Sequence, residues 1–301
     1  MFIASTLEGM EAICKKEVKG EEISTCRIQF DRKPSEIKSA LVVYEKLAHF
    51  KFKEEKDLQK QLQEIYFEVK DPFRVDCHRE GTHKFGSQEV KEFLGEFLYK
   101  KGHKVNLHHP KTIVYVDIKD KECFVGLNPE NVGKRSYRIR GSRQALNATI
   151  AYGLLKIADY KNNDLLLDPF CNDGVILIEA GLEEGKKLYG FNDYLENVKI
   201  NSFNAKVKIE LHNEELDWLG TLFKENSVDK IITQPDLRKK DEMKEMFNQA
   251  KTILKDNGLI VMISPKIDVI EKIAKNYGFK GKNELSINNG DIKYEIMSFT
   301  K

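Results

Sequence analysis

The C-terminal half of the chain alternates short apolar runs with helical patterns, and this alternation constrains the fold more than any other feature. Runs at 165–167 and 259–262 contain no polar residue, which is typical of strands buried on both faces of a parallel sheet. Helical patterns over 195–205, 241–254 and 267–277 separate such runs. The alternation predicts a doubly wound α/β sheet, mostly parallel, with a reversed final strand near 293–299.

The N-terminal half predicts a second α/β layer. Residues 73–77 alternate apolar and polar side chains, as in a half-buried strand. Ser87 then caps a helix with an apolar stripe, and two strand patterns follow at 112–118 and 123–126. Residues 35–48 predict a further helix, because their apolar positions repeat with the helical period. We expect residues 51–65 to form a linker or an exposed helix.

Composition excludes several classes of protein. The 301 residues include 50 lysines and arginines against 48 acids and only five cysteines. No two cysteines have the spacing of a metal or redox motif, so we expect no metal site and a reducing, cytoplasmic location. No apolar run is long enough to cross a membrane, and the first residues do not resemble a signal peptide. We expect Trp218, the single tryptophan, to pack in the core.

Polar residues follow the predicted strands of the C-terminal sheet, where ligands of open α/β folds bind. The first strand ends in D-P-F-C-N-D-G at 168–174. Asn172 and Gly174 tolerate positive φ and predict a sharp turn into the next helix, and Asp168 is placed to accept a hydrogen bond from a ligand ammonium. The loop matches neither the dinucleotide fingerprint nor the P-loop. By itself, Asp168-Pro169 is equally compatible with a simple strand end.

The next strands end in similar polar clusters. Asn192 and Asp193 follow the second strand, where an acid commonly binds a ribose. Glu214 lies after the third strand, and Gln234-Pro235-Asp236-Leu237 after the fourth. We expect these clusters to share one rim of the sheet.

A basic segment joins the two halves. No acid occurs between Asn131 and Ala158, and several arginines lie in that gap. Such a segment is suited to neutralising phosphates, and Tyr137 within it to stacking on a base. A solvated interdomain linker would have the same charge pattern.

Several motifs together resemble the THUMP-domain RNA methyltransferases, which are class I enzymes dependent on S-adenosylmethionine. D-P-F-C-N-D-G-V-I-L-I-E-A at 168–180 is similar to the family's cofactor loop, and R-E-G-T-H-K-F at 79–85 to the central THUMP motif. K-R-S-Y-R-I-R-G at 134–141 is similar to the segment that joins the two domains. The resemblance implies a ferredoxin-like N-terminal domain (1–55), a THUMP domain (56–141) and a Rossmann-like methyltransferase domain (142–301).

The resemblance also implies a function: methyl transfer to the exocyclic N2 of a guanosine in tRNA, bound through its acceptor stem and 3′ end. It places S-adenosylmethionine against Asp168, Phe170, Asn172, Gly174, Asn192, Asp193 and Glu214. It assigns catalysis to Gln234, Pro235 and Asp236. It assigns RNA binding to Arg79, Lys84, Lys134, Arg135, Tyr137, Arg138, Arg140 and Arg143.

The catalytic segment departs from the family pattern. The family has N-P-P-Y or D-P-P-Y where this chain has Gln234-Pro235-Asp236-Leu237. Gln234 is longer by one methylene, and Leu237 lacks the ring that stacks on a flipped base. One alternative is therefore a non-catalytic RNA-binding relative that has a protein partner. A second alternative, a DNA adenine methyltransferase, is disfavoured by the THUMP-like half.

Overall fold

The computed structural model describes residues 1–142 and 145–301, so Arg143 lies outside the described residues. The chain divides into two compact units. The N-terminal unit contains Met1–Ser5, Val18–Ser35 and Val42–Val132, and the C-terminal unit contains Thr6–Glu17, Glu36–Leu41 and Gly133–Lys301. Each unit has its own sheet. The three domain boundaries drawn from the sequence stay a prediction.

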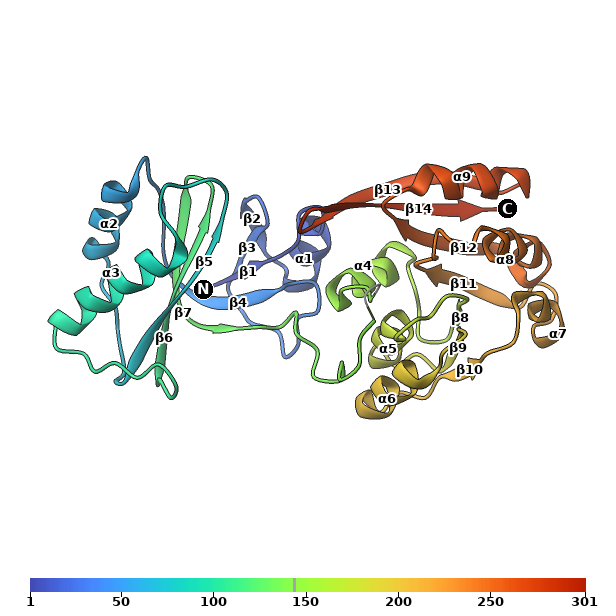
Figure 1. The fold of residues 1–301 in the computed structure, drawn as a ribbon, viewed down its shortest axis with the longest axis horizontal. Coiled ribbons are helices and arrows are strands. Elements are labelled where there is room, and N and C mark those ends of the chain that lie inside the picture. The colour runs from blue at the N-terminus through green and yellow to red at the C-terminus, as the bar shows by residue number, and fades with distance from the viewer. Residues whose placement is uncertain (143–144) are drawn as a thin grey trace. The chain divides into compact units, whose positions relative to one another are not determined.

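The described residues of the N-terminal unit form one seven-stranded sheet in the order β2-β3-β1-β4-β7-β6-β5 (Figure 1). Only β5 and β6 pair in parallel. The strands are β1 (Phe2–Ser5), β2 (Glu21–Ser24), β3 (Arg27–Phe30), β4 (Val42–Lys51), β5 (Phe73–Glu80), β6 (Thr112–Lys119) and β7 (Glu122–Glu130).

Two helices complete the core of this unit. Helix α2 (Glu55–Glu64) buries Leu58 and Leu62, and helix α3 (Ser87–Lys100) buries the apolar stripe predicted from the sequence. These side chains share one cluster with inward-facing residues of β5, β6 and β7. The region expected to be a linker or an exposed helix is therefore a half-buried helix.

The helix predicted at 35–48 is wrong, because β4 begins at Val42 and residues 35–41 form no helix. Val43 and Tyr44 are buried, and β4 pairs with β1 on one side and β7 on the other. The apolar spacing fits both structures, but β-branched and aromatic residues favour the strand once two neighbours are available. Strands β2 and β3 had no counterpart among the predictions.

The C-terminal unit has the predicted doubly wound sheet, in the order β10-β9-β8-β11-β12-β14-β13. Its strands are β8 (Leu165–Asp168), β9 (Lys187–Phe191), β10 (Glu210–His212), β11 (Val228–Thr233), β12 (Leu254–Ser264), β13 (Lys280–Asn289) and β14 (Ile292–Thr300). Strands β8 to β12 are parallel, and β14 runs antiparallel to β12, which confirms the reversed final strand. The long strand β13 was not predicted.

Helices cover both faces of this sheet (Figure 1). One cluster contains residues of α4 (Ala148–Ile157), α5 (Val175–Leu182) and α6 (Glu196–Ala205), with Met10 beside α1 (Glu11–Val18). The other contains residues of the short helices η1 (Leu216–Trp218) and α7 (Leu219–Leu222) and of α8 (Lys240–Ile253) and α9 (Ile267–Asn276). The strand order reverses between β8 and β11, which places a ligand site at their carboxyl ends.

Two sequence expectations about apolar segments can be compared with the structure. Trp218 is 52% exposed, so its predicted core position is wrong, because Leu216 and Leu219 fill the apolar side of that turn. Among the residues that the structure describes, no helix has the length and apolar character needed to cross a membrane.

Candidate active site

The loop after β8 makes the sharp turn that the sequence predicted. Asn172 has φ 52° and Gly174 has φ 81°, and α5 begins at the next residue. A Cβ atom on Gly174 would lie 2.3 Å from Val198 Cγ2, so both the backbone conformation and the space require glycine. The turn is confirmed, and it brings the start of α5 to the carboxyl end of the sheet.

Asp168 ends β8 and is fully buried. Its Oδ1 accepts hydrogen bonds from Thr233 Oγ1 at 2.5 Å and from the Phe170 N–H at 3.2 Å. Burial raises the pKa of Asp168 to about 7, and the two hydrogen bonds only partly oppose that rise. Asp168 therefore changes its charge near neutral pH.

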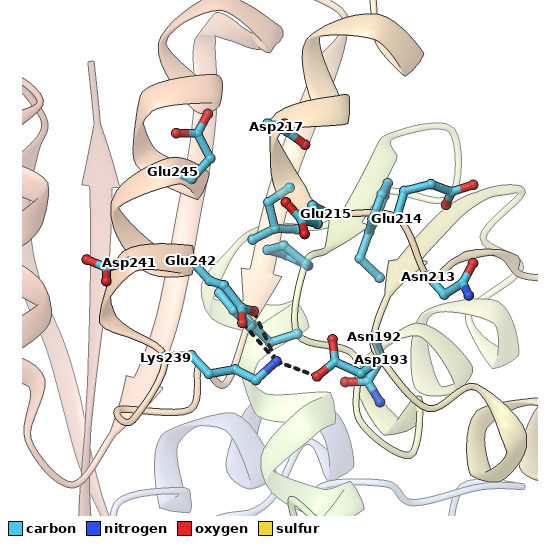
Figure 2. A pocket seen from close by; sticks show the side chains of 14 residues that line it. Asn192, Asp193, Asn213, Glu214, Glu215, Asp217, Lys239, Asp241, Glu242 and Glu245 are labelled. Carbon is cyan, nitrogen blue, oxygen red and sulfur yellow. Dashed lines mark hydrogen bonds and ion pairs between the residues drawn. The ribbon is translucent and has the colours of Figure 1, made fainter.

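A cavity of about 500 Å³ lies beyond the ends of β9 and β10, within the usual range for small-molecule sites (Figure 2). It contains four of the predicted cofactor residues, namely Phe170, Asn192, Asp193 and Glu214. Seven carboxylates and one lysine line it. Lys239 Nζ lies 2.6 Å from Asp193 Oδ2 and also contacts Glu242. This lining favours a ligand with positive charge and hydroxyl donors.

A separate narrow crevice lies at the carboxyl ends of β8 and β11. Its lining includes Asp168, Asn172, Asp173 and Gln234, and Phe170 lines both spaces. The crevice has about 10 Å³ of accessible volume, which is room for one water-sized group. The structure thus brings the predicted cofactor loop and the first residue of the predicted catalytic segment together.

The other three residues of the predicted catalytic segment have contacts outside the cavity and the crevice. Pro235 is buried, and Asp236 Oδ2 lies 2.6 Å from Arg238 Nη2 in an ion pair. Leu237 packs against the second core cluster. Among the described residues, the linings of the cavity and the crevice include Gln234 but neither Pro235 nor Asp236.

The site fits the S-adenosylmethionine implied by the resemblance. Phe170 and Phe191 offer apolar rings to a purine, and Asn192 and Asp193 offer acceptors to ribose hydroxyls. The acidic lining suits a sulfonium and an ammonium. Asn172, Asp168 and Gln234 would lie toward the amino-acid arm and the reacting methyl group.

The basic connector, which we define as residues 134–142, is largely bound to its own unit. Arg135 makes two hydrogen bonds to the buried Glu179, and Tyr137 donates its hydroxyl to the same carboxylate. Arg138 Nη2 lies 3.0 Å from Asp173 Oδ2. Tyr137 is 5% exposed, so the prediction that it stacks on a base is wrong: the ring fills the core.

Two connector cations remain candidates for contact with phosphates. Lys134 and Arg140 are exposed, whereas Arg135 and Arg138 face buried acids. In the N-terminal unit, Lys84 is exposed in the loop after β5, a position open to a phosphate.

Arg79, the other predicted RNA-binding residue of that unit, is only partly exposed. One of its guanidinium nitrogens donates to the Gly81 carbonyl at 3.0 Å and lies 2.8 Å from His83 Nδ1. It therefore orders the THUMP-like loop from within.

Sequence reasoning missed three residues that organise the site. Glu179 is a single acid within an apolar helix, Asn201 is a fully buried amide in α6, and Asp173 is a nearly fully buried acid in the cofactor loop. A lone polar residue in an apolar helix was the available signal for Glu179. Asn201 had no comparable signal, because it lies in a mixed polar segment.

Comparisons with known protein families match one domain in each half of the chain. Residues 53–128 match the THUMP domain, and residues 135–192 match the RMKL-like methyltransferase domain. A tRNA (guanine(6)-N2)-methyltransferase of Archaeoglobus fulgidus is 27% identical over 274 residues, covering 75% of this chain and 69% of that protein. An enzyme of the same name from Methanocaldococcus jannaschii is 27% identical over 290 residues, covering 76% of this chain and 75% of that protein.

Solved structures agree at the level of the fold. TrmN from Thermus thermophilus superposes with a TM-score of 0.80 at 23% identity, covering 100% of this chain and 99% of that one. SMU.472, described as a putative methyltransferase complexed with SAH, gives 0.75 at 14% identity, covering 99% and 97%. The chain therefore combines a match to the THUMP domain with a match to the RMKL-like methyltransferase domain, which confirms the predicted resemblance to the THUMP-domain methyltransferases.

Proposed function

We propose that this protein is an S-adenosylmethionine-dependent tRNA methyltransferase that modifies the exocyclic N2 of a guanosine. The observation that carries the proposal is the arrangement at the switch point of the sheet. There the loop residues 168–173, the ribose-side pair Asn192 and Asp193, and Gln234 line two spaces that share Phe170. The printed names of the two archaeal relatives support guanosine N2 in tRNA as the target.

In the proposed methyl transfer, the main task of the protein is to position the guanosine amine. S-adenosylmethionine supplies an electrophilic methyl group on sulfur. The guanosine amine is a poor nucleophile because its lone pair is delocalised into the ring. The Gln234 amide oxygen and the Pro235 carbonyl accept hydrogen bonds from the two N–H groups of this amine. The lone pair of the amine nitrogen then points at the methyl group. Transfer is then a direct displacement without a covalent enzyme intermediate.

The tRNA is bound through phosphates and through its acceptor stem and 3′ end. The THUMP domain contributes Lys84, and the connector contributes Lys134 and Arg140. These side chains are exposed, and neutralising phosphates is the main source of affinity for proteins of this kind. The target guanosine leaves its stack to reach Gln234.

Transfer of a tritiated methyl group to unmodified total tRNA, followed by nucleoside mapping, tests the proposal. We expect N2-methylguanosine as the product. Gln234→Ala should abolish single-turnover transfer and leave the calorimetric affinity for S-adenosylmethionine unchanged. The exposed helix residue Gln63 provides the matched control, and Gln63→Ala should behave as wild type. Wild-type single-turnover transfer by Gln234→Ala would remove Gln234 from the mechanism.

A further inference from the structure

Asp173 combines burial with an incomplete set of hydrogen bonds. The residue is 1% exposed and lines the crevice with Asp168, Asn172 and Gln234. Its Oδ2 lies 3.0 Å from Arg138 Nη2, whereas its Oδ1 is buried without a hydrogen-bond partner among the described residues. Burial raises the pKa of Asp173, opposed first by Arg138. A buried carboxylate oxygen in this state is costly unless a ligand donates to it.

The connector fixes Asp173 in place. Asn201 is fully buried, and its Oδ1 accepts from the N–H groups of Ile139 at 3.1 Å and Arg140 at 3.0 Å. Its Nδ2 donates to the carbonyls of Arg140 at 2.7 Å and Asp173 at 3.1 Å. One amide therefore ties the connector to the cofactor loop. Arg138 then holds one carboxylate oxygen of Asp173 and leaves the other available.

The connector also contacts Asn172, the residue before Asp173 in the cofactor loop. Ser142 Oγ donates to Asn172 Oδ1 at 2.9 Å. Asn172 and Asp173 are adjacent residues of the cofactor loop. Both side chains have a partner in the connector, which shows that the loop and the connector fit each other.

We propose that Asp173 binds the ammonium of the cofactor's amino-acid arm, and that Arg138 and Asn201 are positioning residues that hold it in place. This inference rests on the proposed function. The larger cavity has the volume and the hydroxyl acceptors that the nucleoside needs, so the arm on the other side of the sulfur is the part that enters the crevice.

The chemistry of the crevice selects an ammonium. Its volume accommodates a single water-sized group. The crevice presents the carboxylates of Asp168 and Asp173, and an ammonium has three donors and no acceptor. Asp168 already accepts from Thr233 and Phe170 through Oδ1, so the unpartnered oxygen of Asp173 is the better acceptor.

The test compares two ligands in calorimetric titrations of the full chain. S-adenosylhomocysteine carries the ammonium, and 5′-methylthioadenosine lacks the amino-acid arm. Asp173→Asn keeps the shape and removes the charge. We expect it to weaken S-adenosylhomocysteine about 10- to 100-fold, the range for a charge-assisted hydrogen bond, and to leave 5′-methylthioadenosine unchanged. Asp173→Ser should give the same pattern.

The positioning role has its own readout. Arg138→Gln should weaken S-adenosylhomocysteine several-fold without affecting 5′-methylthioadenosine, and Arg138→Lys should recover part of the loss. Arg32, an exposed arginine of the N-terminal unit, provides the control, and Arg32→Gln should bind both ligands as wild type does. Equal losses for both ligands, or no loss, in Asp173→Asn would overturn the inference while the proposed function stands. A wild-type protein that binds neither ligand would overturn both.

Discussion

Arg135 and Glu179 form a two-point ion pair between the connector and the helix that follows the cofactor loop. Arg135 Nε and Nη2 lie 2.9 Å and 3.2 Å from the two carboxylate oxygens, and Tyr137 donates to the same group at 2.7 Å. Glu179 is fully buried. Because removal of one partner leaves a buried charge unpaired, this pair couples the order of the connector to the stability of α5.

Glu179→Gln should lower the free energy of unfolding by about 3–5 kcal/mol, since Arg135 then loses the buried carboxylate that accepts two of its hydrogen bonds. Urea denaturation followed by circular dichroism measures the change. Glu225 is exposed in the loop before β11, and Glu225→Gln should change stability by no more than about 0.5 kcal/mol. Equal stabilities of the two variants would show that Glu179 does not anchor the connector.

The raised pKa of Asp168 predicts how the free energy of unfolding depends on pH. Its pKa is about 7 in the folded protein against an ordinary value of 3.8. Between these values the folded protein holds a proton that the unfolded chain has released. The free energy of unfolding therefore falls as the pH rises through this window, by about 4 kcal/mol in total from this group. Below the window the contribution is absent.

The variant Asp168→Asn mimics the protonated side chain and therefore tests this dependence of stability on pH. The variant should match wild type at pH 4 and exceed it at pH 8, by up to about 4 kcal/mol in urea denaturation. Asp256→Asn, at a side chain that is 93% exposed, should follow the wild-type curve. A wild-type difference between pH 4 and pH 8 that survives in Asp168→Asn would assign the effect to other groups, with buried Asp173 the first candidate.

The sequence predicted the C-terminal sheet well because its signals are local. The apolar runs of β8 and β12 and the polar residues after them mark strand ends independently of what packs around them. Strand β4 shows the limit. Its apolar spacing also fits a helix, and only its pairing with β1 and β7 decides between the two structures. Pairing between residues distant along the chain is not encoded in any short window.

The residues of the candidate site were likewise predictable only where their sequence signals are local. Asp168, Asn192 and Gln234 were found because they follow strands, and the structure places them around the cavity and the crevice. Tyr137 and Arg135 were read as surface groups, since a basic segment without acids has no local partner. Their partner Glu179 lies 44 residues from Arg135 along the chain. Only folding brings that acid and the connector together.

The length of the Gln234 side chain gives a third prediction. Gln234→Asn restores the family's residue type but withdraws the amide oxygen by about 1.5 Å. If the loop has adapted to glutamine, the single-turnover rate should fall about 100-fold, as expected for a reacting group displaced by about 1 Å. The affinity for S-adenosylmethionine should not change. A rate equal to or above wild type would mean that the loop retains the geometry for asparagine.

The exposed cations predict how tRNA affinity depends on salt. Lys84 and Arg140 are exposed, and each phosphate contact contributes about 0.7–0.9 to the slope of log affinity against log salt concentration. Lys84→Ala and Arg140→Ala should each reduce the slope by about that amount and weaken all tRNA sequences alike, in fluorescence anisotropy titrations. Lys224 is an exposed lysine in the loop before β11, and Lys224→Ala should leave the slope unchanged. A reduced slope in Lys224→Ala together with an unchanged slope in Lys84→Ala would place the RNA on a different surface.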